Sequence, residues 1–193
     1  VRITNKTTLQ NDEAATRPES FFSGALHGNE RVGVLTVTEL AGFLCSEYER
    51  GNVEIRRLVD GRSTWIMPMT NAYGYAHNTR EEKNMDPNRD FSYLTDPSQC
   101  MLTQTGRAVN ELFRRHLFQF TLTFHGGMRA LSYEWGSVNH LRKGKSTESP
   151  DDNAFAQVGE EISHVAGRGW YPLGRINDMV YPVDGGLEDW SYG

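Results

Sequence analysis

The sequence predicts an α/β layered fold, and it places two histidines at the ends of predicted strands. Strand-like apolar runs alternate with segments whose apolar residues recur at helical spacing, with no internal repeat or low-complexity tract between them. Two of the strand-like runs, residues 21–26 and 118–124, are each followed directly by a histidine, His27 and His125. Ligands of open α/β sheets gather at the carboxyl ends of strands, so these histidines are expected to lie near a functional site.

The first predicted helix follows the strand at residues 21–26. It begins at about Glu30, and Gly51 supplies its stop, because glycine readily adopts the left-handed conformation that ends helices. The apolar residues that recur at helical spacing are Val34, Leu35, Val37, Leu40, Leu44 and Tyr48.

The middle of the chain is expected to supply two more strands. Residues 63–69 read as a strand in which Pro68 cannot donate to a central ladder, and a turn at 71–74 follows. A polar loop is predicted over 77–96 and a helix from about 103 to 116, after which the strand at 118–124 delivers His125.

The last third of the chain contains one predicted helix and an irregular tail. The helix starts near residue 151, with Asp151 or Asp152 as its cap. Its predicted buried face consists of Phe155, Val158 and Ile162. Residues 169–193 are rich in glycine and aromatic side chains, so loops with a short strand are expected there.

The composition limits the classes of function. A chain of 193 residues can bury one good-sized core, and nothing in the composition marks a second domain. The net charge of −5 gives no basic surface for nucleic acid or an anionic membrane, and no apolar stretch is long enough to span a bilayer. Cys45 and Cys100 provide neither a disulfide framework nor a thiolate zinc site.

His27, Glu30 and His125 form a set of ligands that zinc would select. Two histidines and one carboxylate leave the fourth tetrahedral position free for water, which is the pattern of catalytic zinc. Residues three apart at a helical turn point the same way, so His27 and Glu30 can reach one ion. The competing interpretations are a surface turn for the His-x-x-Glu pair and a satisfied core histidine for His125. The pattern predicts a metallohydrolase with one zinc ion.

Five segments resemble the zinc carboxypeptidase family, the group that contains carboxypeptidases A, B, D and E. They occur in the family's order and span nearly the whole chain: residues 27–30, 86–91, 124–127, 149–152 and 181–192. The resemblance implies a mixed, largely parallel twisted sheet with helices on both faces. It also implies that residues 1–193 form a single catalytic domain that is partial, because the family's general-base glutamate would follow residue 193.

The resemblance assigns a role to each candidate residue around the metal. His27, Glu30 and His125 would hold one Zn²⁺ ion, which polarises the scissile carbonyl and activates water as the nucleophile. Asp86 would accept a hydrogen bond from His27 and so fix its orientation. Arg80 would stabilise the oxyanion of the tetrahedral intermediate.

Further residues would recognise the substrate. Asn88 and Arg89 would grip its terminal carboxylate, because a guanidinium offers two parallel charge-assisted hydrogen bonds. Tyr181 would close over the bound peptide. Glu188 matches the floor of the side-chain pocket, which predicts a preference for basic C-terminal residues. The alternative is that a protein cation neutralises Glu188, with Arg175 as one candidate.

The leading hypothesis is a metallocarboxypeptidase that acts on the C-termini of peptides or proteins. Two alternatives remain: a related zinc amidase, deacylase or murein-peptide hydrolase, and an inactive carboxypeptidase-like binding domain. The sequence leaves the oligomeric state and the natural substrate undetermined. The compartment is also open, although the resemblance favours the secretory pathway.

Overall fold

The chain divides into two compact units in the computed structural model. The structure describes residues 1–9, 17–94 and 96–193. The first unit contains Val1–Asn84 and Arg107–Gly126, and the second contains Met85–Gly106 and Gly127–Gly193. The single catalytic domain expected over residues 1–193 stays a prediction, and each unit is considered by itself.

The first unit is built on a four-stranded sheet with the order β1-β3-β2-β4. The central strand β2 pairs in parallel with β3 and with β4, whereas β1 is antiparallel to β3. The strands are β1 (Arg2–Ile3), β2 (Glu19–Gly24), β3 (Ser63–Met67) and β4 (Phe118–Phe124). The three longer strands and the largely parallel sheet were predicted, but β1 was not. The strand β3 ends just before Pro68, which has no N–H for the ladder.

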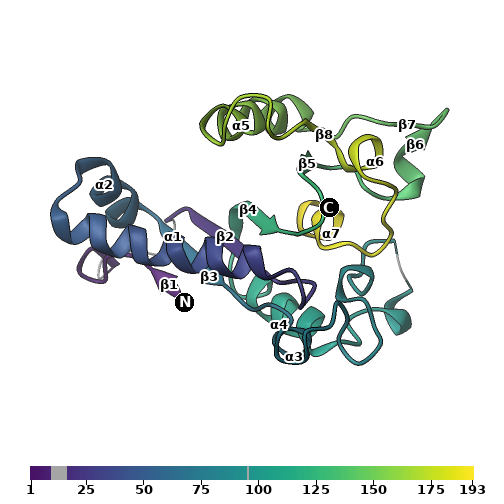
Figure 1. Cartoon of the computed structure of the whole chain (residues 1–193), viewed down its shortest axis with the longest axis horizontal. Helices are drawn as coiled ribbons and strands as arrows, with labels where there is room; N and C mark the ends of the chain where they lie inside the picture. The colour runs from purple at the N-terminus through teal and green to yellow at the C-terminus, as the bar shows by residue number, and fades with distance from the viewer. Residues whose placement is uncertain (10–16, 95) are drawn as a thin grey trace. The chain divides into compact units, whose positions relative to one another are not determined.

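The long helix α1 (Arg31–Arg50) runs along this sheet (Figure 1). Gly51 ends it at φ 86°, so the predicted stop is confirmed. The next helix, α2 (Val53–Gly61), was not predicted, although Asn52 is a recognisable cap whose side chain accepts from the N–H groups of Glu54 and Ile55. Three further helical segments are η1 (Thr7–Leu9), α3 (Ala72–His77) and α4 (Gln104–Phe113), the last of which ends three residues earlier than expected.

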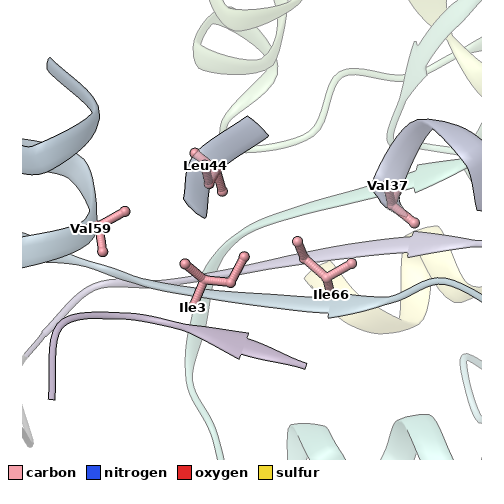
Figure 2. Packing of buried hydrophobic residues seen from close by; sticks show 5 residues of the cluster. All are labelled: Ile3, Val37, Leu44, Val59 and Ile66. Atoms are coloured by element: carbon pink, nitrogen blue, oxygen red, sulfur yellow. The ribbon is translucent and has the colours of Figure 1, made fainter. Parts of the chain in front are cut away.

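One face of the sheet packs against α1 and α2 through a small aliphatic core. Figure 2 shows its five buried residues pointing toward one another from two helices and two strands: Ile3, Val37, Leu44, Val59 and Ile66. Burying one such side chain contributes about 1.5–3 kcal/mol. Leu35 lies outside this core and is 62% exposed, so its place on the predicted apolar face of α1 is wrong.

The opposite face of the sheet is covered by α4. Phe21 is fully buried, and its ring centroid lies 5.5 Å from that of Phe113 in α4. The next residue, Phe22, packs against the aliphatic core on the α1 side, because successive side chains of a strand point to opposite faces. Helices therefore lie on both faces of the sheet, as the predicted fold class requires.

The second unit contains two small sheets and three helices. Strands β5 (Leu131–Tyr133) and β8 (Leu173–Arg175) pair in parallel, and β6 (Leu141–Arg142) and β7 (Lys145–Ser146) pair antiparallel. The helices are α5 (Asp152–Val165), α6 (Ile176–Met179) and α7 (Leu187–Tyr192), with 3-10 turns η3 (Pro87–Arg89), η4 (Pro97–Gln99) and η5 (Val138–His140). The short strand in the tail was predicted, but α6 and α7 were not.

The predicted start of α5 is confirmed, with Asp151 at its cap position, but one residue of the predicted buried face is wrong. Asp151 occupies the cap position without a side-chain capping bond, and its Oδ2 accepts from the Tyr192 hydroxyl at 3.0 Å instead. Val158 is 44% exposed, whereas Phe155 and Ile162 are partly buried as expected. Among the described residues, every helix is too short or too polar to cross a membrane.

Candidate functional site

The two histidines predicted as metal ligands follow neighbouring parallel strands. In the register of β2 and β4, Gly24 lies opposite Phe124. His125 comes directly after Phe124, and His27 comes three residues after Gly24. Because the carboxyl ends of parallel strands meet at one edge of a sheet, both imidazoles are delivered to the same place.

The loop that carries His27 is fixed by backbone contacts. The carbonyl oxygen of Ala25 accepts from the Asn71 N–H at 2.8 Å, and the Gly28 N–H donates to the Arg80 carbonyl oxygen at 3.1 Å. A Cβ atom at Gly28 would come within 2.1 Å of the Gly74 carbonyl carbon in α3. Only glycine permits this close approach, so the loop is held against the backbone of α3.

Glu30 stands at the cap position of α1, but its carboxylate does not cap the helix. Its Oε1 lies 2.8 Å from His27 Nδ1, and its Oε2 lies 2.9 Å from His125 Nδ1. The predicted convergence of the His-x-x-Glu pair with the distant histidine is therefore present in the structure. The surface-turn and core-histidine interpretations leave this convergence unexplained.

The spacing of the donor atoms fits a zinc ion. The two Nδ1 atoms are 3.2 Å apart, and the ligand atoms of all three residues lie within 4.8 Å of one another. Two nitrogen ligands at the usual zinc distance and a tetrahedral angle would be separated by about 3.3 Å. The His27 side chain is 5% exposed and that of His125 is 35% exposed, so the group is open on the His125 side.

The electrostatics favour the ligating form of Glu30. Burial disfavours its charge, but hydrogen bonds from His125 and His27 outweigh burial and hold the pKa of Glu30 well below its usual range. The carboxylate is thus ionised. A zinc ion would replace the two N–H donors, because histidine binds a metal through an unprotonated nitrogen.

Arg80 lies beside this group. Its Nη1 is 3.4 Å from Glu30 Oε1, and the side chain is 38% exposed. A guanidinium at this place can stabilise negative charge that develops next to the metal. The structure thus brings together four of the predicted site residues within the first unit: His27, Glu30, Arg80 and His125.

The second unit holds the residues predicted to bind the substrate carboxylate. Asp86 caps the turn η3, with its Oδ1 accepting from the Asn88 N–H at 2.8 Å. Asn88 is 7% exposed, and its Oδ1 accepts from the Leu187 N–H at 2.9 Å. Arg89 Nη1 donates to the Asn88 carbonyl oxygen at 2.7 Å. The predicted hydrogen bond between Asp86 and His27 stays a prediction.

Arg89 also lies next to Tyr181, although the two are distant in sequence. The guanidinium carbon is 5.9 Å from the centroid of the Tyr181 ring, which is within the range of a cation–π contact, and Tyr181 is 50% exposed. Gly185, at φ 70°, packs so closely that a Cβ atom there would come within 2.5 Å of the Arg89 carbonyl oxygen. The Phe91 N–H donates to the Gly185 carbonyl oxygen at 3.0 Å. Residues 86–91 and 181–192 therefore pack together within the second unit.

Glu188 is partly buried at the start of α7. A Cβ atom at Gly136 would come 3.3 Å from Glu188 Oε1, so the carboxylate lies against the chain after β5. Arg175, the candidate cation beside Glu188, is bound instead by Asp152 at 2.5 and 2.8 Å and by Glu148 at 3.2 Å. Arg175 thus pairs with these two acids, and its role as the neutralising partner of Glu188 stays a prediction.

Two further acidic residues beside Glu188 were missed. Asp189 is 1% exposed and accepts from the N–H groups of Gly136 and Ser137, both at 2.8 Å. Glu134 is 8% exposed, and its Oε2 has no hydrogen-bond partner among the described residues. Glu134 could not be recognised from the sequence, because a single acidic residue after a short strand is typical of a solvated charge.

Comparison with known proteins agrees with this geometry. The family model described as zinc carboxypeptidase matches residues 1–193. The chain belongs to the zinc carboxypeptidase family. The predicted family is therefore confirmed, and the relatives of the chain are metallocarboxypeptidases.

Individual relatives are similar over most of this chain. The carboxypeptidase N catalytic chain of Mus musculus is 26% identical over 91% of the chain, carboxypeptidase D of Homo sapiens is 27% identical over 91%, and carboxypeptidase SOL1 of Arabidopsis thaliana is 27% identical over 93%. The chain spans 48%, 14% and 38% of the lengths of these relatives, respectively.

Solved structures show the same fold at lower identity. Carboxypeptidase A from Helicoverpa armigera superposes with a TM-score of 0.73 at 17% identity, over 98% of this chain and 52% of that one. Bovine thrombin-activatable fibrinolysis inhibitor, solved in complex with tick carboxypeptidase inhibitor, also gives 0.73 at 17% identity, over 92% of this chain and 68% of that one. The predicted fold class is confirmed.

Proposed function

We propose that the protein that carries this chain is a zinc-dependent metallocarboxypeptidase that removes C-terminal residues from peptides or proteins. One observation carries the proposal: the Nδ1 atoms of His27 and His125 lie 2.8 and 2.9 Å from the two carboxylate oxygens of Glu30 at the carboxyl edge of a parallel sheet. When bound, zinc would act as a Lewis acid toward the scissile carbonyl and would acidify a water molecule.

The residues around the metal would orient it and stabilise charge. His27, Glu30 and His125 would hold the ion, and Asp86 would fix the orientation of His27 by accepting its second ring N–H. Arg80, already 3.4 Å from Glu30, would donate to the oxygen on which negative charge develops.

Recognition of a free C-terminus would fall to Asn88, Arg89 and Tyr181. Asn88 Oδ1 accepts a hydrogen bond from the Leu187 N–H. This bond orients the side-chain amide so that Nδ2 can donate to the substrate carboxylate. Arg89 would supply the charge-assisted bonds to the carboxylate. Tyr181, half exposed above Arg89, would close over the peptide. These contacts favour a carboxypeptidase over a zinc amidase or murein-peptide hydrolase.

Glu188 would select the side chain of the residue that is removed. Its carboxylate lies against the chain after β5, and the proposed protein cation, Arg175, is engaged by Asp152. A substrate Lys or Arg would form a charge-assisted hydrogen bond with the Glu188 carboxylate. Location in the secretory pathway stays a prediction.

The test compares a peptide with a free C-terminal carboxylate and the same peptide as its amide, using the zinc-loaded full-length protein. Mass spectrometry should show loss of one residue from the free peptide alone. Arg89→Ala should lower kcat/KM by about a hundredfold, because truncating one partner of a desolvated charge pair costs roughly 2–5 kcal/mol. Arg114→Ala, at a 69% exposed side chain in the first unit, is the control.

Equal cleavage of the amidated peptide would favour the amidase alternative. Zinc binding without cleavage of either peptide would favour the inactive binding domain. Peptides ending in Arg and Phe then test the pocket: faster removal of Phe would reject a preference for basic residues.

A further inference from the structure

We propose that Glu134 is a second acidic residue, beside Glu188, of the pocket that receives a cationic side chain of the substrate. The inference rests on the proposed function and adds a specificity residue to it. It depends on the position of Glu134, on the unfilled hydrogen-bonding capacity of its carboxyl group and on the charges that surround it.

The position of Glu134 is set by the segment that follows β5. Two residues later, Gly136 lies against Glu188 Oε1, with a Cβ-to-oxygen distance that would be 3.3 Å. The N–H groups of Gly136 and Ser137 both donate to Asp189 at 2.8 Å. These contacts tie the segment after Glu134 to the start of α7, which carries Glu188.

The carboxyl group of Glu134 has an unfilled acceptor. The residue is 8% exposed, and Oε2 is buried with no hydrogen-bond partner among the described residues. Leaving a buried polar atom unpaired costs free energy, and native proteins retain few such atoms without a reason. Both oxygens of the neighbouring Asp189 are occupied by backbone N–H groups, so Glu134 is the buried acid with spare capacity.

The charges around Glu134 fit a role that depends on a cation. Burial raises the pKa of Glu134 to about 7, its own backbone N–H opposes this shift, and the negative charges of Asp189 and Glu188 raise the pKa further. A guanidinium stays protonated at neutral pH and offers five N–H donors. Its arrival would lower the pKa of Glu134, so the side chain would ionise and release a proton as the ligand binds.

The test uses two small ligands that share a terminal carboxylate and have side chains of nearly the same shape, one cationic and one neutral. Nα-acetylarginine carries a guanidinium, whereas Nα-acetylcitrulline carries a neutral urea group of nearly the same shape. Binding to the full-length protein is measured by titration calorimetry at pH 6, 7 and 8, in buffers of different ionisation enthalpy. The variants are Glu134→Gln and, as a control, Glu160→Gln on the exposed side of α5.

The wild type and the control should prefer acetylarginine, and this preference should grow as the pH rises through 7 and Glu134 loses its proton. Glu134→Gln should reduce the preference about tenfold at pH 8 and make it independent of pH. At pH 7 the wild type should release a fraction of a proton on binding acetylarginine and none on binding acetylcitrulline. The proton release needs no variant, so it tests the inference even if Glu134→Gln fails to fold.

Two results would overturn the inference: an unchanged preference in Glu134→Gln, or equal proton release with both ligands. Either would identify Glu134 as a neutral acid of the interior only. Failure of the wild type to bind both ligands is a different result, because it contradicts the proposed recognition of the terminal carboxylate by Asn88 and Arg89.

Discussion

Glu30 is partly buried and Glu134 is buried, and their surroundings drive the two carboxyl groups to opposite states of ionisation. Hydrogen bonds from His125 and His27 outweigh burial at Glu30 and hold its pKa below the usual range. At Glu134, burial and the charges of Asp189 and Glu188 act together and raise the pKa to about 7. The partner within hydrogen-bonding distance, more than burial itself, decides which carboxyl group is charged.

This contrast predicts a pH dependence of stability that is specific to Glu134. Its pKa is about 7 in the folded chain against an ordinary value of 4.5, so its contribution is fully present below 4.5 and is lost as the pH rises through 7. Glu134→Gln should therefore be more stable than wild type by up to about 3 kcal/mol at pH 8, but by less than about 1 kcal/mol at pH 5. Urea unfolding across this range measures the difference.

Glu160→Gln, at an exposed position, should follow the wild type at every pH. A Glu134→Gln variant whose stability differs from wild type by the same amount at pH 5 and pH 8 would show that Glu134 does not titrate in this window.

At the scale of elements, the first unit depends on how α1 is seated. Its N-cap residue, Glu30, lies at the proposed metal site, while Val37 and Leu44 anchor the middle of the helix in the aliphatic core (Figure 2). Gly33 permits this seating, because a Cβ atom there would come within 2.9 Å of Phe124 in β4. The same packing that stabilises the sheet therefore also positions a ligand.

Leu44→Ala should destabilise the protein by about 2–4 kcal/mol, because the side chain is 3% exposed and its removal leaves a cavity. The matched change Leu35→Ala, on the same helix at a 62% exposed position, should alter the free energy of unfolding by less than about 0.5 kcal/mol. Chemical denaturation measures both. Similar losses in the two variants would contradict the packing of α1 on the sheet through Leu44.

Element by element, the sequence was most informative where periodic apolar runs are long. The strand at 118–124 and the helix that begins after Glu30 were predicted closely, because burial on one face imposes a clear period. The short elements β1, α6 and α7 were missed, since two to six residues carry too few periods to recognise. The exposure of Leu35 and Val158 could not be predicted either. Helical spacing shows which residues share a face of a helix, but not how much of that face the neighbouring elements cover.

At the scale of the whole protein, a metal ion should connect separate parts of the chain. The ligands follow β2 and β4, which are about a hundred residues apart in sequence, so zinc would stabilise the folded chain relative to the unfolded one. At a hundred times its Kd, one zinc ion adds about 2.7 kcal/mol, which should raise the Tm by roughly 5–10 °C.

His125→Ala should lose both this shift and the bound zinc, whereas His164→Ala, at an exposed position on α5, should keep both. Thermal melts with zinc and with a chelator, together with metal analysis, measure the two effects. Equal zinc content in wild type and His125→Ala would remove the basis of the proposed metal site.

The sequence by itself determined the family, the α/β class and the residue types that can bind zinc. Each of these follows from the order of residues within short segments and from the chemistry of their side chains. Tertiary structure decided which side chains meet. It joined His125 to Glu30 and placed Arg89 beside Tyr181, contacts that no local spacing encodes. It also buried Glu134 beside Glu188, because the environment of a carboxyl group is set by whatever packs around it rather than by its neighbours in sequence.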